Sequence, residues 1–578
     1  MCAGCRHCLL LRARLRVTPH FWPSIHPVWR RCSSVEYCPV CSLLAPCHPG
    51  ASTPTKCEPI LDRTLRAAQV NLTVSCRPDR PAGISDRMTR MLAKPDSFDA
   101  LPLPETSLRG LFRHFGPGMI LMMTGVGTSH LLTAPAAGGR FEFALLWCIP
   151  VAYIFKYYGF EMAFRFTNAT GRSMLDAYTT APGKWPVWYV LVTTLIQAAL
   201  GQAGRLAAAA AVLFYVFSEV LGLELSTYGL ALGGLSVGII LYGRYAAVEL
   251  ATKMLAGLLF VSTVGVYLFR PAPLSEMGHF FTFEVPGGSW LIIAAFLGLL
   301  PTGMDVSLQA SEWGKAKRVG MGRIREQLEQ EGYARPFDPF ASTKSDLTVD
   351  VSTLPEHAQE YCRRWFRIGL WDFSFGHVVS AVLAAIFLLL AAVWLYPSPV
   401  EGRAVIGEIA GIFPPAMRVV FLAGAFAATF STAFNYFDGW PRVVAACCRN
   451  LFRTTAALPG IAVHQLTEAH RGTWSSEYNV YRLTMVYSLA AAVLIIAGLP
   501  RPVFLVLVSS ALAFFIAPVI FFLNLYYCFT VIPKTDRVFY PSRFATWFSW
   551  FSLVVFTGLT VVVIIARIYQ PLVEMLGG

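Results

Sequence analysis

Residues Gly125–Gly139 read GVGTSHLLTAPAAGG and lie inside one of the most apolar stretches of the chain. The glycines at the start of this segment and Pro135 further on are poor helix formers. In hydrocarbon, an unwound backbone leaves amide and carbonyl groups unpaired, at several kcal/mol each, so a break survives only where it lines a polar cavity or a bound ligand. The segment therefore predicts a broken membrane helix that opens a ligand site, with His130 facing that site.

A second apolar run is interrupted in the same way. Residues Phe296–Trp313 read FLGLLPTGMDVSLQASEW, in which Pro301 and two glycines precede Asp305. A carboxylate at this depth costs roughly 2.5–3.5 kcal/mol on insertion scales, so it needs a partner or a function. Interrupted helices in corresponding positions of two halves indicate the midplane site of a transporter. We expect a cation there, held by residues of both breaks: Gly127, Thr128, Ser129, His130, Thr302, Gly303, Met304 and Asp305.

The composition indicates that these breaks belong to a membrane protein. Of 578 residues, 55% are hydrophobic and only 14% are charged, whereas about a quarter of the residues of a soluble domain are charged. Since a helix needs about 20 mostly apolar residues to cross the hydrocarbon core, the sequence predicts an all-α, multi-pass protein in a lipid bilayer, with about eleven spans. The expected spans are 117–136, 142–165, 186–218, 226–243, 246–269, 289–309, 370–396, 412–437, 483–499, 502–531 and 545–568.

Lys and Arg residues gather in the even-numbered connections between these spans, for example at Arg244 and from Lys315 to Arg325. The positive-inside rule then places the N-terminus in the cytoplasm and the C-terminus outside. This topology accounts for the net charge of +13. No basic-aromatic motif points to nucleic acid, so we expect no nucleic-acid partner. Frequent Ala, Arg, Gly and Pro favour a bacterial cytoplasmic membrane, and no feature of the sequence points to a particular oligomeric state.

Residues 1–90 do not share this pattern. They hold nine of the fourteen cysteines, including those of CAGCRHC from Cys2 and of CPVC from Cys38, and they lack a periodic apolar segment. Paired CxxC thiolates are typical of a small zinc module. We favour the alternative, a disordered extension or a start assigned too early, because Met88 and Met91 stand just before the membrane part.

Residues 91–578 form the expected transmembrane transporter domain. One soluble excursion at 314–367 interrupts it, with a helix-like start, turn residues in the middle and a basic end. The charge rule puts this loop in the cytoplasm, where it is a gating or docking element or simply a solvated loop. Lys156 and Glu161 lie near the inner end of the second span, so we expect their charges to reach the interface.

The first break sits in a longer stretch that carries a family resemblance. Residues His114–Trp147 read HFGPGMILMMTGVGTSHLLTAPAAGGRFEFALLW, and the frame GPG followed by AAGxxFxxALLW resembles the first-helix region of the Nramp (natural resistance-associated macrophage protein) family of divalent-metal transporters. Small-residue runs such as LAGAFAATFSTAF, residues Leu422–Phe434, belong to the same resemblance, which extends from about residue 109 through the tenth span. It implies a 5+5 inverted-repeat transporter fold with broken helices 1 and 6, and it does not cover residues 1–90.

The two breaks depart from the pattern of the family. Its first-helix signature Asp-Pro-Gly-Asn aligns with Gly127–His130, and its sixth-helix signature Met-Pro-His aligns with Gly303–Asp305. In the third span, Ala199 and Gln202 stand where the family carries two acids of its proton route, and Arg205 follows one turn later. These departures predict weak or absent proton coupling.

The residues at the breaks still offer ligands to a divalent cation. His130 brings an imidazole, Asp305 a carboxylate and Met304 a thioether, while the hydroxyl residues add oxygen donors. This mixed set suits a first-row ion such as Mn²⁺ or Fe²⁺, whereas Mg²⁺ would keep several of its waters. The alternatives are a hydrogen-bonded core histidine, a methionine that only fills the core, and an Asp305 that neutralises Arg205 across the bundle.

The leading hypothesis is a secondary transporter that moves a divalent metal cation by alternating access, with the first and sixth spans rocking against a scaffold. Two alternatives are a transporter of the same fold for a small organic or amino-acid substrate, and a non-transporting relative that acts as a sensor or docking scaffold. The sequence has no Walker loop, nucleophile elbow, HExxH motif or Rossmann glycines. We therefore expect no enzyme activity, no ATP-driven step, and no cofactor besides the transported cation, such as Mn, Fe or Mg.

Overall fold

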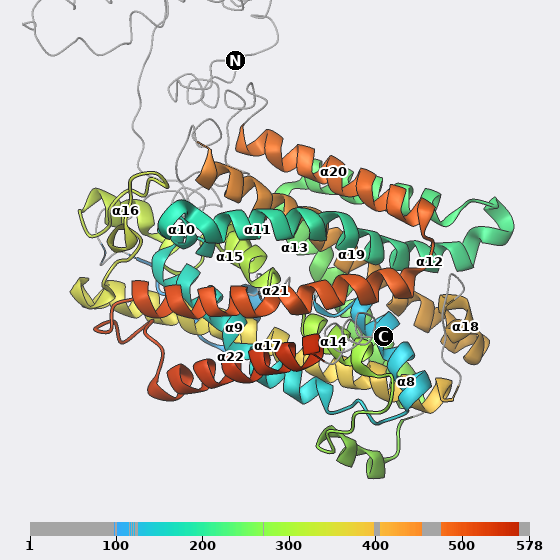
Figure 1. The fold of residues 1–578 in the computed structure, drawn as a ribbon. Coiled ribbons are helices and arrows are strands. Elements are labelled where there is room, and N and C mark those ends of the chain that lie inside the picture. Colours follow the sequence, from blue (N-terminus) through green and yellow to red (C-terminus); the bar gives the residue numbers. More distant parts are fainter. Residues whose placement is uncertain are drawn as a thin grey trace, which may run out of the picture. The chain divides into compact units, whose positions relative to one another are not determined.

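The computed structural model describes Phe98 and residues 101–565, except for 115, 117, 119–120, 122–124, 270, 398–404 and 453–475. Every regular element in this part of the chain is helical (Figure 1). In chain order the α-helices are α6 (Leu108–His114), α8 (Thr128–Phe141), α9 (Cys148–Thr170), α10 (Met174–Tyr178), α11 (Trp185–Ile196), α12 (Gln202–Leu221), α13 (Leu225–Phe269), α14 (Trp290–Leu299), α15 (Val306–Lys317), α16 (Arg325–Gln330), α17 (Glu356–Leu395), α18 (Val405–Ile412), α19 (Pro415–Leu451), α20 (Glu477–Gly498), α21 (Pro502–Val531) and α22 (Arg543–Ile564).

These helices confirm the predicted multi-pass, all-α class. In the described residues, eight stretches are long and apolar enough to cross a membrane. Helix α9 carries three charged side chains but has 23 residues, enough for a span. Together with the two interrupted spans, these elements follow the order of the eleven predicted spans. The chain is therefore a multi-pass protein whose surroundings are a lipid bilayer.

Helix α13 corresponds to two predicted spans. It has 45 residues and measures about 68 Å at 1.5 Å per residue, roughly twice the thickness of the hydrocarbon core. Its segments Leu225–Tyr242 and Leu250–Phe269 are each long and apolar enough to span. The backbone stays helical at Arg244, where the sequence predicted a basic connection. The two apolar segments of α13 therefore correspond to the predicted spans 226–243 and 246–269, although the backbone between them is helical.

Both predicted breaks are present. The backbone is not helical at Val126 and Gly127, and α8 begins at Thr128. In the sixth span, α14 ends at Leu299 and α15 starts only at Val306, so six residues between them are unwound. The poor helix formers that predicted these breaks, glycines in the first and Pro301 with Gly303 in the second, lie in or beside the unwound segments.

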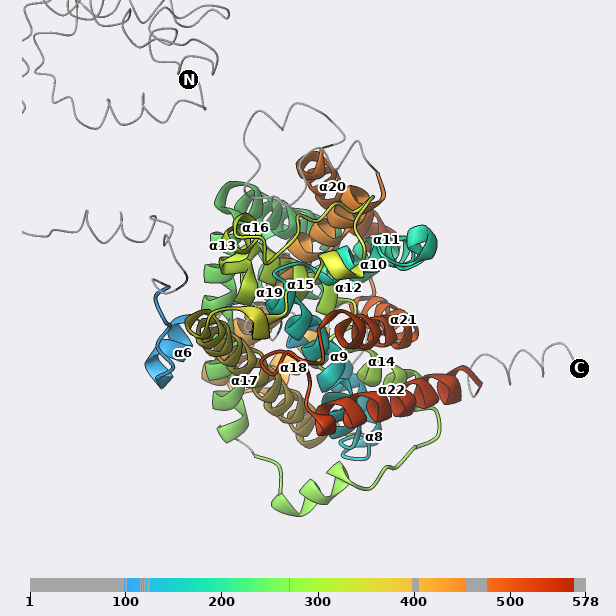
Figure 2. The ribbon, with the colours of Figure 1, turned by 90° about the vertical axis from the view of Figure 1, so that its left-hand side faces the viewer.

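Helix α9 occupies the interior next to both broken spans. It contacts α14, α15, α17, α21 and α22 (Figure 2). Glycines on its partners allow close approach of helices, as is common in membrane bundles. For instance, the position that a Cβ atom of Gly369 on α17 would take lies 2.8 Å from the ring of Phe164. Residues of α9 can therefore reach the break in the sixth span.

The connections lie at two ends of the bundle. Helices α10 and α16 share one end, whereas α18 lies at the opposite end (Figure 1). This grouping agrees with the alternation of connections that the sequence predicted. The predicted excursion 314–367 is shorter than expected, because α15 runs to Lys317 and α17 starts at Glu356. The chain divides into Met1–Ala93 and Lys94–Gly578, and the Cys-rich extension predicted at 1–90 lies outside the described residues.

A buried ion cluster joins helices at the end that carries α10. Asp176 of α10 pairs with Lys315 Nζ and with Arg449 Nη2, both at 2.9 Å, and Arg449 Nη1 lies 2.7 Å from Glu477 Oε1. Burial alone would raise the pKa of Asp176, but the charges of Lys315 and Arg449 lower this pKa well below its usual value. The cluster ties α15, the second half of the sixth span, to α10, α19 and α20.

The predicted sidedness is tested by cysteine labelling at the two ends. We expect Ser345→Cys, in the connection after α16, to react with a membrane-impermeant maleimide only in inside-out vesicles. Ser275→Cys, before α14, should react only in intact cells, because basic connections stay in the cytoplasm. Labelling is measured against the unsubstituted protein, and the reverse pattern would contradict the predicted orientation.

Candidate functional site

The two breaks lie against each other. A Cβ atom added to Gly125 would collide with the carbonyl oxygen of Pro301 and would lie 3.6 Å from the Cβ atom of Thr302. Gly127 packs as closely against α19, where an added Cβ atom would collide with Thr432 Oγ1 and lie 2.6 Å from the carbonyl oxygen of Ala428. The unwound segments of the first and sixth spans therefore meet beside α19, as expected if residues of both breaks form one ligand site.

Asp305 stands at this meeting point, at the N-terminal end of α15. Trp440 Nε1 donates to its carboxylate at 3.1 Å, and Gln309 Nε2 lies 3.4 Å from the same oxygen. A carboxylate is favourable next to a helix N-terminus, where backbone N–H groups give a partial positive charge. Asp305 is partly exposed, unlike Trp440 and Gln309, which are buried. Its carboxylate is therefore held by two side chains, while the residue as a whole remains partly exposed.

Arg205 of α12 lies next to this carboxylate without forming a direct ion pair in the described part of the chain. Its Nη1 atom donates to the carbonyl oxygen of Gly201 at 2.8 Å. The guanidinium lies 3.9 Å from the ring centre of Tyr436 and 5.0 Å from that of Trp440, and its charge acts on Asp305 through space. Trp440 thus stands between the cation and the carboxylate, so the neutralisation of Asp305 by Arg205 is indirect.

A short π-helix shapes the third span at this level. It covers Gln197–Gly201, between α11 and α12, and such π-bulges are frequent at functional sites. The Cβ position of Gly201 would lie 2.7 Å from Gln197 Oε1 and 2.8 Å from Arg205 Nη1. Gln197 Oε1 and Gln309 Oε1 are buried oxygens without a hydrogen-bond partner in the described residues. These two buried amide oxygens belong to side chains next to Arg205 and Asp305, and no periodicity in the sequence predicted this π-helix.

The other residues predicted from the second break are divided by the structure. Thr302 Oγ1 lies 3.1 Å from Tyr436 Oη, and Gly303 lies directly beside the Asp305 carboxylate. Met304 is fully buried, and its sulfur and methyl group pack where the Cβ atom of Gly159 on α9 would be. Thr302 and Gly303 therefore lie on the side of Tyr436 and Asp305, whereas Met304 packs between α9 and α15.

Of the residues predicted from the first break, His130 points elsewhere. His130 is buried, its Nε2 atom lies 3.4 Å from Tyr153 Oη, and its ring packs against Phe387 at 6.3 Å. It therefore faces α9 and α17, as expected of a hydrogen-bonded core histidine. The carbonyl oxygen of Gly127 accepts a hydrogen bond from Leu131 N at 3.0 Å, so the backbone of the first break pairs with α8. The side chains of Thr128 and Ser129 lie outside the described ones, and their role as ligands stays a prediction.

Lys156, which lies next to the break in the sixth span, had been expected at the membrane interface. Lys156 is completely buried, and its ammonium group donates to four carbonyl oxygens of the unwound sixth span. The expectation that its charge reaches the interface was therefore wrong. Sequence reasoning missed that Lys156 lies near the middle of α9. From there its long side chain reaches backbone carbonyl oxygens that have no partner inside a helix.

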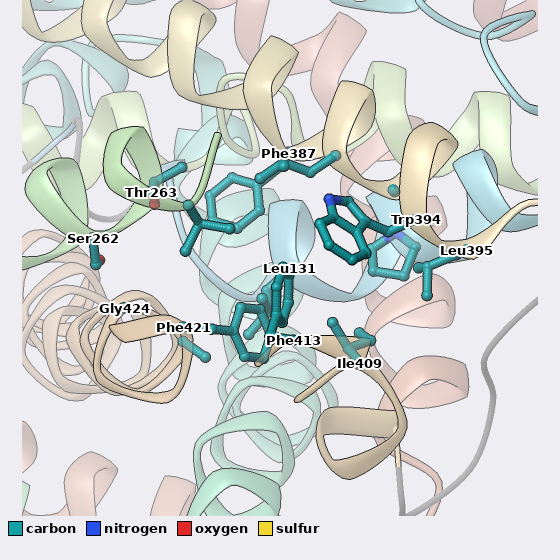
Figure 3. Close-up of a pocket in the computed structure, with 15 residues that line it drawn as sticks. Leu131, Ser262, Thr263, Phe387, Trp394, Leu395, Ile409, Phe413, Phe421 and Gly424 are labelled. Carbon is teal, nitrogen blue, oxygen red and sulfur yellow. The ribbon is translucent and has the colours of Figure 1, made fainter. Parts of the chain in front are cut away.

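On the side of α8, apolar side chains pack together around a small cavity. Figure 3 shows Leu131, Phe387, Trp394, Phe413 and Phe421 around a cavity. Its volume is about 40 Å³, which is room for about one water molecule and too little for a hydrated ion. Helix α18 covers this side, since Phe413 directly follows it. These side chains form an apolar layer around the cavity between α8, α17 and α18.

No group of three or more His, Cys, Asp or Glu residues is arranged to hold a metal in the part of the chain that the structure describes. The site instead combines one carboxylate, Asp305, with the cations Arg205 and Lys156 and with hydroxyl and amide groups. This arrangement can bind a cation through Asp305 only if Arg205 and Lys156 are held by other partners. Arg205 donates to the carbonyl oxygen of Gly201, and Lys156 donates to carbonyl oxygens of the sixth span.

Comparisons with known proteins agree with this architecture. The profile of the family described as "Nramp: Natural resistance-associated macrophage protein-like" matches residues 118–566. An uncharacterized protein of Pasteurella multocida (strain Pm70) is 23% identical over 378 residues, which cover 61% of this chain and 77% of that protein.

Two solved structures of a manganese transporter from Eremococcus coleocola have the same fold. A variant of that transporter gives a TM-score of 0.57 at 12% identity and covers 81% of this chain and 89% of its own. The complex with an aromatic bis-isothiourea substituted compound also gives 0.57 at 12% identity, over 81% and 90%. The predicted inverted-repeat transporter fold with broken helices 1 and 6 is thereby confirmed.

The close packing of the first break is tested by Gly127→Ala. The added Cβ atom would meet the backbone carbonyl of Ala428, which cannot move away as a side chain can. We expect a loss of about 1–3 kcal/mol of stability from overpacking, measured as a lower melting temperature of the purified protein. Gly234→Ala is the control, because nothing lies within 4 Å of its added Cβ atom. Equal melting temperatures for the two variants would contradict this packing.

Proposed function

Because this chain belongs to the Nramp family, we propose that it moves a divalent metal cation across a membrane by alternating access, with the cation bound where the two broken spans meet. The observation that carries the proposal is Asp305, a partly exposed acidic residue without a direct ion pair in the described part of the chain, at the end of the unwound segment that contains Thr302. The similarity of fold to a transporter named for manganese supports this class of cargo.

The donors around Asp305 favour a hard cation. They are the Asp305 carboxylate and, in the same unwound segment, the Thr302 hydroxyl. Such oxygen ligands, together with water, suit Mg²⁺ and Mn²⁺ better than softer ions. Because Arg205 lies nearby and only one carboxylate is present, we propose that the cation keeps part of its water shell and binds weakly.

One observation favours a second candidate. Arg205 and Asp305 present opposite charges beside the rings of Tyr436 and Trp440. A small zwitterionic solute, such as an amino acid, would find a partner for its carboxylate, a partner for its amine, and apolar surface at this place. An organic cargo would then bind where we propose the metal.

We further propose that the protein lies in a bacterial cytoplasmic membrane with its N-terminus in the cytoplasm. The basic connections support this orientation, because Lys315 and Arg325 belong to the end of the bundle that carries α10 and α16. Asp176 and Arg449 hold α15 at the same end, so we propose that this cluster opens and closes the cytoplasmic side.

The metal site is tested by ion flux into proteoliposomes. Asp305→Asn keeps the size of the side chain and removes its charge, so we expect Mn²⁺ or Mg²⁺ uptake to fall about 10- to 100-fold, as for the loss of 1.5–3 kcal/mol from a charged contact. His130→Gln is the matched control. It should keep uptake within about twofold, since His130 faces α9 and α17.

Two outcomes would oppose this assignment. Undiminished metal uptake by Asp305→Asn would remove Asp305 from the cation site. Absence of metal uptake by the unsubstituted protein, together with uptake of an amino acid that excess Mn²⁺ does not inhibit, would replace the metal by an organic cargo.

Proton coupling is tested in the same vesicles with a pH-sensitive dye inside them. We expect metal uptake without acidification of the lumen, because Ala199 and Gln202 cannot carry a proton where the family has two acids. Gln202 is instead fixed by donating to the carbonyl oxygen of Ala433 at 3.0 Å. Acidification that depends on metal uptake would show that another route carries protons.

A further inference from the structure

Lys156 makes an unusual set of contacts in the interior of the bundle. Its Nζ atom lies 3.2 Å from the carbonyl oxygen of Leu297, 2.9 Å from that of Gly298, and 2.7 Å from those of Leu300 and Thr302. Two of these oxygens belong to the last turn of α14 and two to the unwound segment that follows it. The side chain is completely buried, and the described residues show no carboxylate within ion-pair distance of it.

The sequence explains why these oxygens are free. In a continuous helix the carbonyl of Leu297 would accept from the N–H of residue 301, but Pro301 has no N–H. Helix α14 ends at Leu299, so the carbonyls of its last turn have no partner inside the helix. Leu300 and Thr302 lie in the unwound segment and add two more oxygens. The negative end of the helix dipole points at the same place.

This cluster has the form of a cation-binding shell. An ammonium group has three N–H donors, yet four backbone oxygens approach it at no more than 3.2 Å. More oxygens than protons surround the charge, as around a bound metal ion. Phe160 and Phe556 add ring faces at 5.9 Å and 5.6 Å from the nitrogen. The shell therefore binds a positive charge. Its preference for a cation does not depend on directed hydrogen bonds alone.

We propose that the break in the sixth span contains a second cation site, separate from Asp305, and that the ammonium of Lys156 fills this site as a tethered, permanently bound monovalent cation. The site takes Na⁺, K⁺ or a primary alkylammonium once the lysine is removed. With the lysine present, the broken span holds its shape without a bound monovalent ion, and the transporter works in media that contain none. This inference does not depend on the identity of the transported cargo.

The separation of the two sites rests on their contacts. Asp305 is held by Trp440 and Gln309 from the α19 side, whereas Lys156 approaches from α9 and binds backbone only. The charge of Asp305 reaches Lys156 through space. The Thr302 residue joins them, because its carbonyl oxygen binds Lys156 and its hydroxyl faces Tyr436. A change in the Lys156 site is therefore transmitted to the cargo site through one residue.

The test compares two substitutions in the full-length purified protein. Lys156→Ala removes three methylenes and the ammonium, so it leaves a space that n-propylammonium matches and that Na⁺ or K⁺ can enter. Lys156→Met fills the same space without a charge. Both variants should melt well below the unsubstituted protein in choline buffer, since each leaves buried carbonyls unpaired at about 1–3 kcal/mol apiece.

Adding n-propylammonium, Na⁺ or K⁺ should raise the melting temperature of Lys156→Ala and restore at least a tenth of its lost uptake in vesicles. Neither effect should appear for Lys156→Met or for the unsubstituted protein. Lys534→Ala is the matched lysine control, because Lys534 is exposed in the connection after α21, and it should behave as the unsubstituted protein does.

Two results would overturn the proposal. If Lys156→Met has the melting temperature and uptake of the unsubstituted protein, the ammonium only fills space, and this result counts even if Lys156→Ala does not fold. If Lys156→Ala folds and no cation changes its melting temperature, the carbonyls do not form a cation site. The melting temperature requires no transport, so this test can fail while metal uptake through Asp305 stands, and the reverse.

Discussion

Unpaired backbone carbonyls in hydrocarbon are the constraint on which this structure depends. A span that breaks inside a bilayer must satisfy its freed groups from within the protein, because lipid offers no hydrogen bonds. At the sixth span the four exposed carbonyls meet the ammonium of Lys156. At the first break, the chain continues from Gly127 into α8, and the carbonyl oxygen of Gly127 accepts a hydrogen bond from Leu131 N. Each break is thus stabilised by a different solution to the same problem.

The buried charges follow from this constraint. Lys156 neutralises the carbonyl end of α14, and Arg205 lies over aromatic rings and a backbone carbonyl. Because both cations already have partners, the carboxylate of Asp305 does not close into a direct ion pair in the described part of the chain. A direct ion pair with Asp305 would have engaged the carboxylate that a cargo cation needs for binding. The distribution of partners leaves Asp305 partly exposed and outside any direct ion pair in the part of the chain that the structure describes.

Close packing then decides which parts can be a site and which only support it. Gly127 and Gly125 let the first break approach α19 and the sixth span without side chains between them. The same crowding turns His130 toward Tyr153 and Met304 toward Gly159. Both residues have ligand chemistry and lie at the breaks, yet His130 in α8 and Met304 in the unwound segment both point toward α9. The residues that surround Asp305 come instead from α12, α15 and α19.

The sequence by itself determined the features that depend on local chemistry. Hydropathy and length predicted the spans, poor helix formers such as Gly127 and Pro301 predicted both breaks, and the frame from His114 to Trp147 indicated the family. These signals are readable because helix formation and membrane insertion depend on neighbouring residues. The carboxylate at Asp305 was also within reach of sequence reasoning, since a charge inside a span requires a purpose.

Only the tertiary structure decided which side chains meet. Lys156 lies about 140 residues from the carbonyls that it binds, and nothing in its own span tells that they are free. The π-helix at Gln197–Gly201 and the placement of Arg205 beside Trp440 also arise from packing between distant helices. Direction around a helix axis decides whether His130 serves the site or the core. That direction is fixed by neighbouring helices, because a helix exposes all its faces until others cover them.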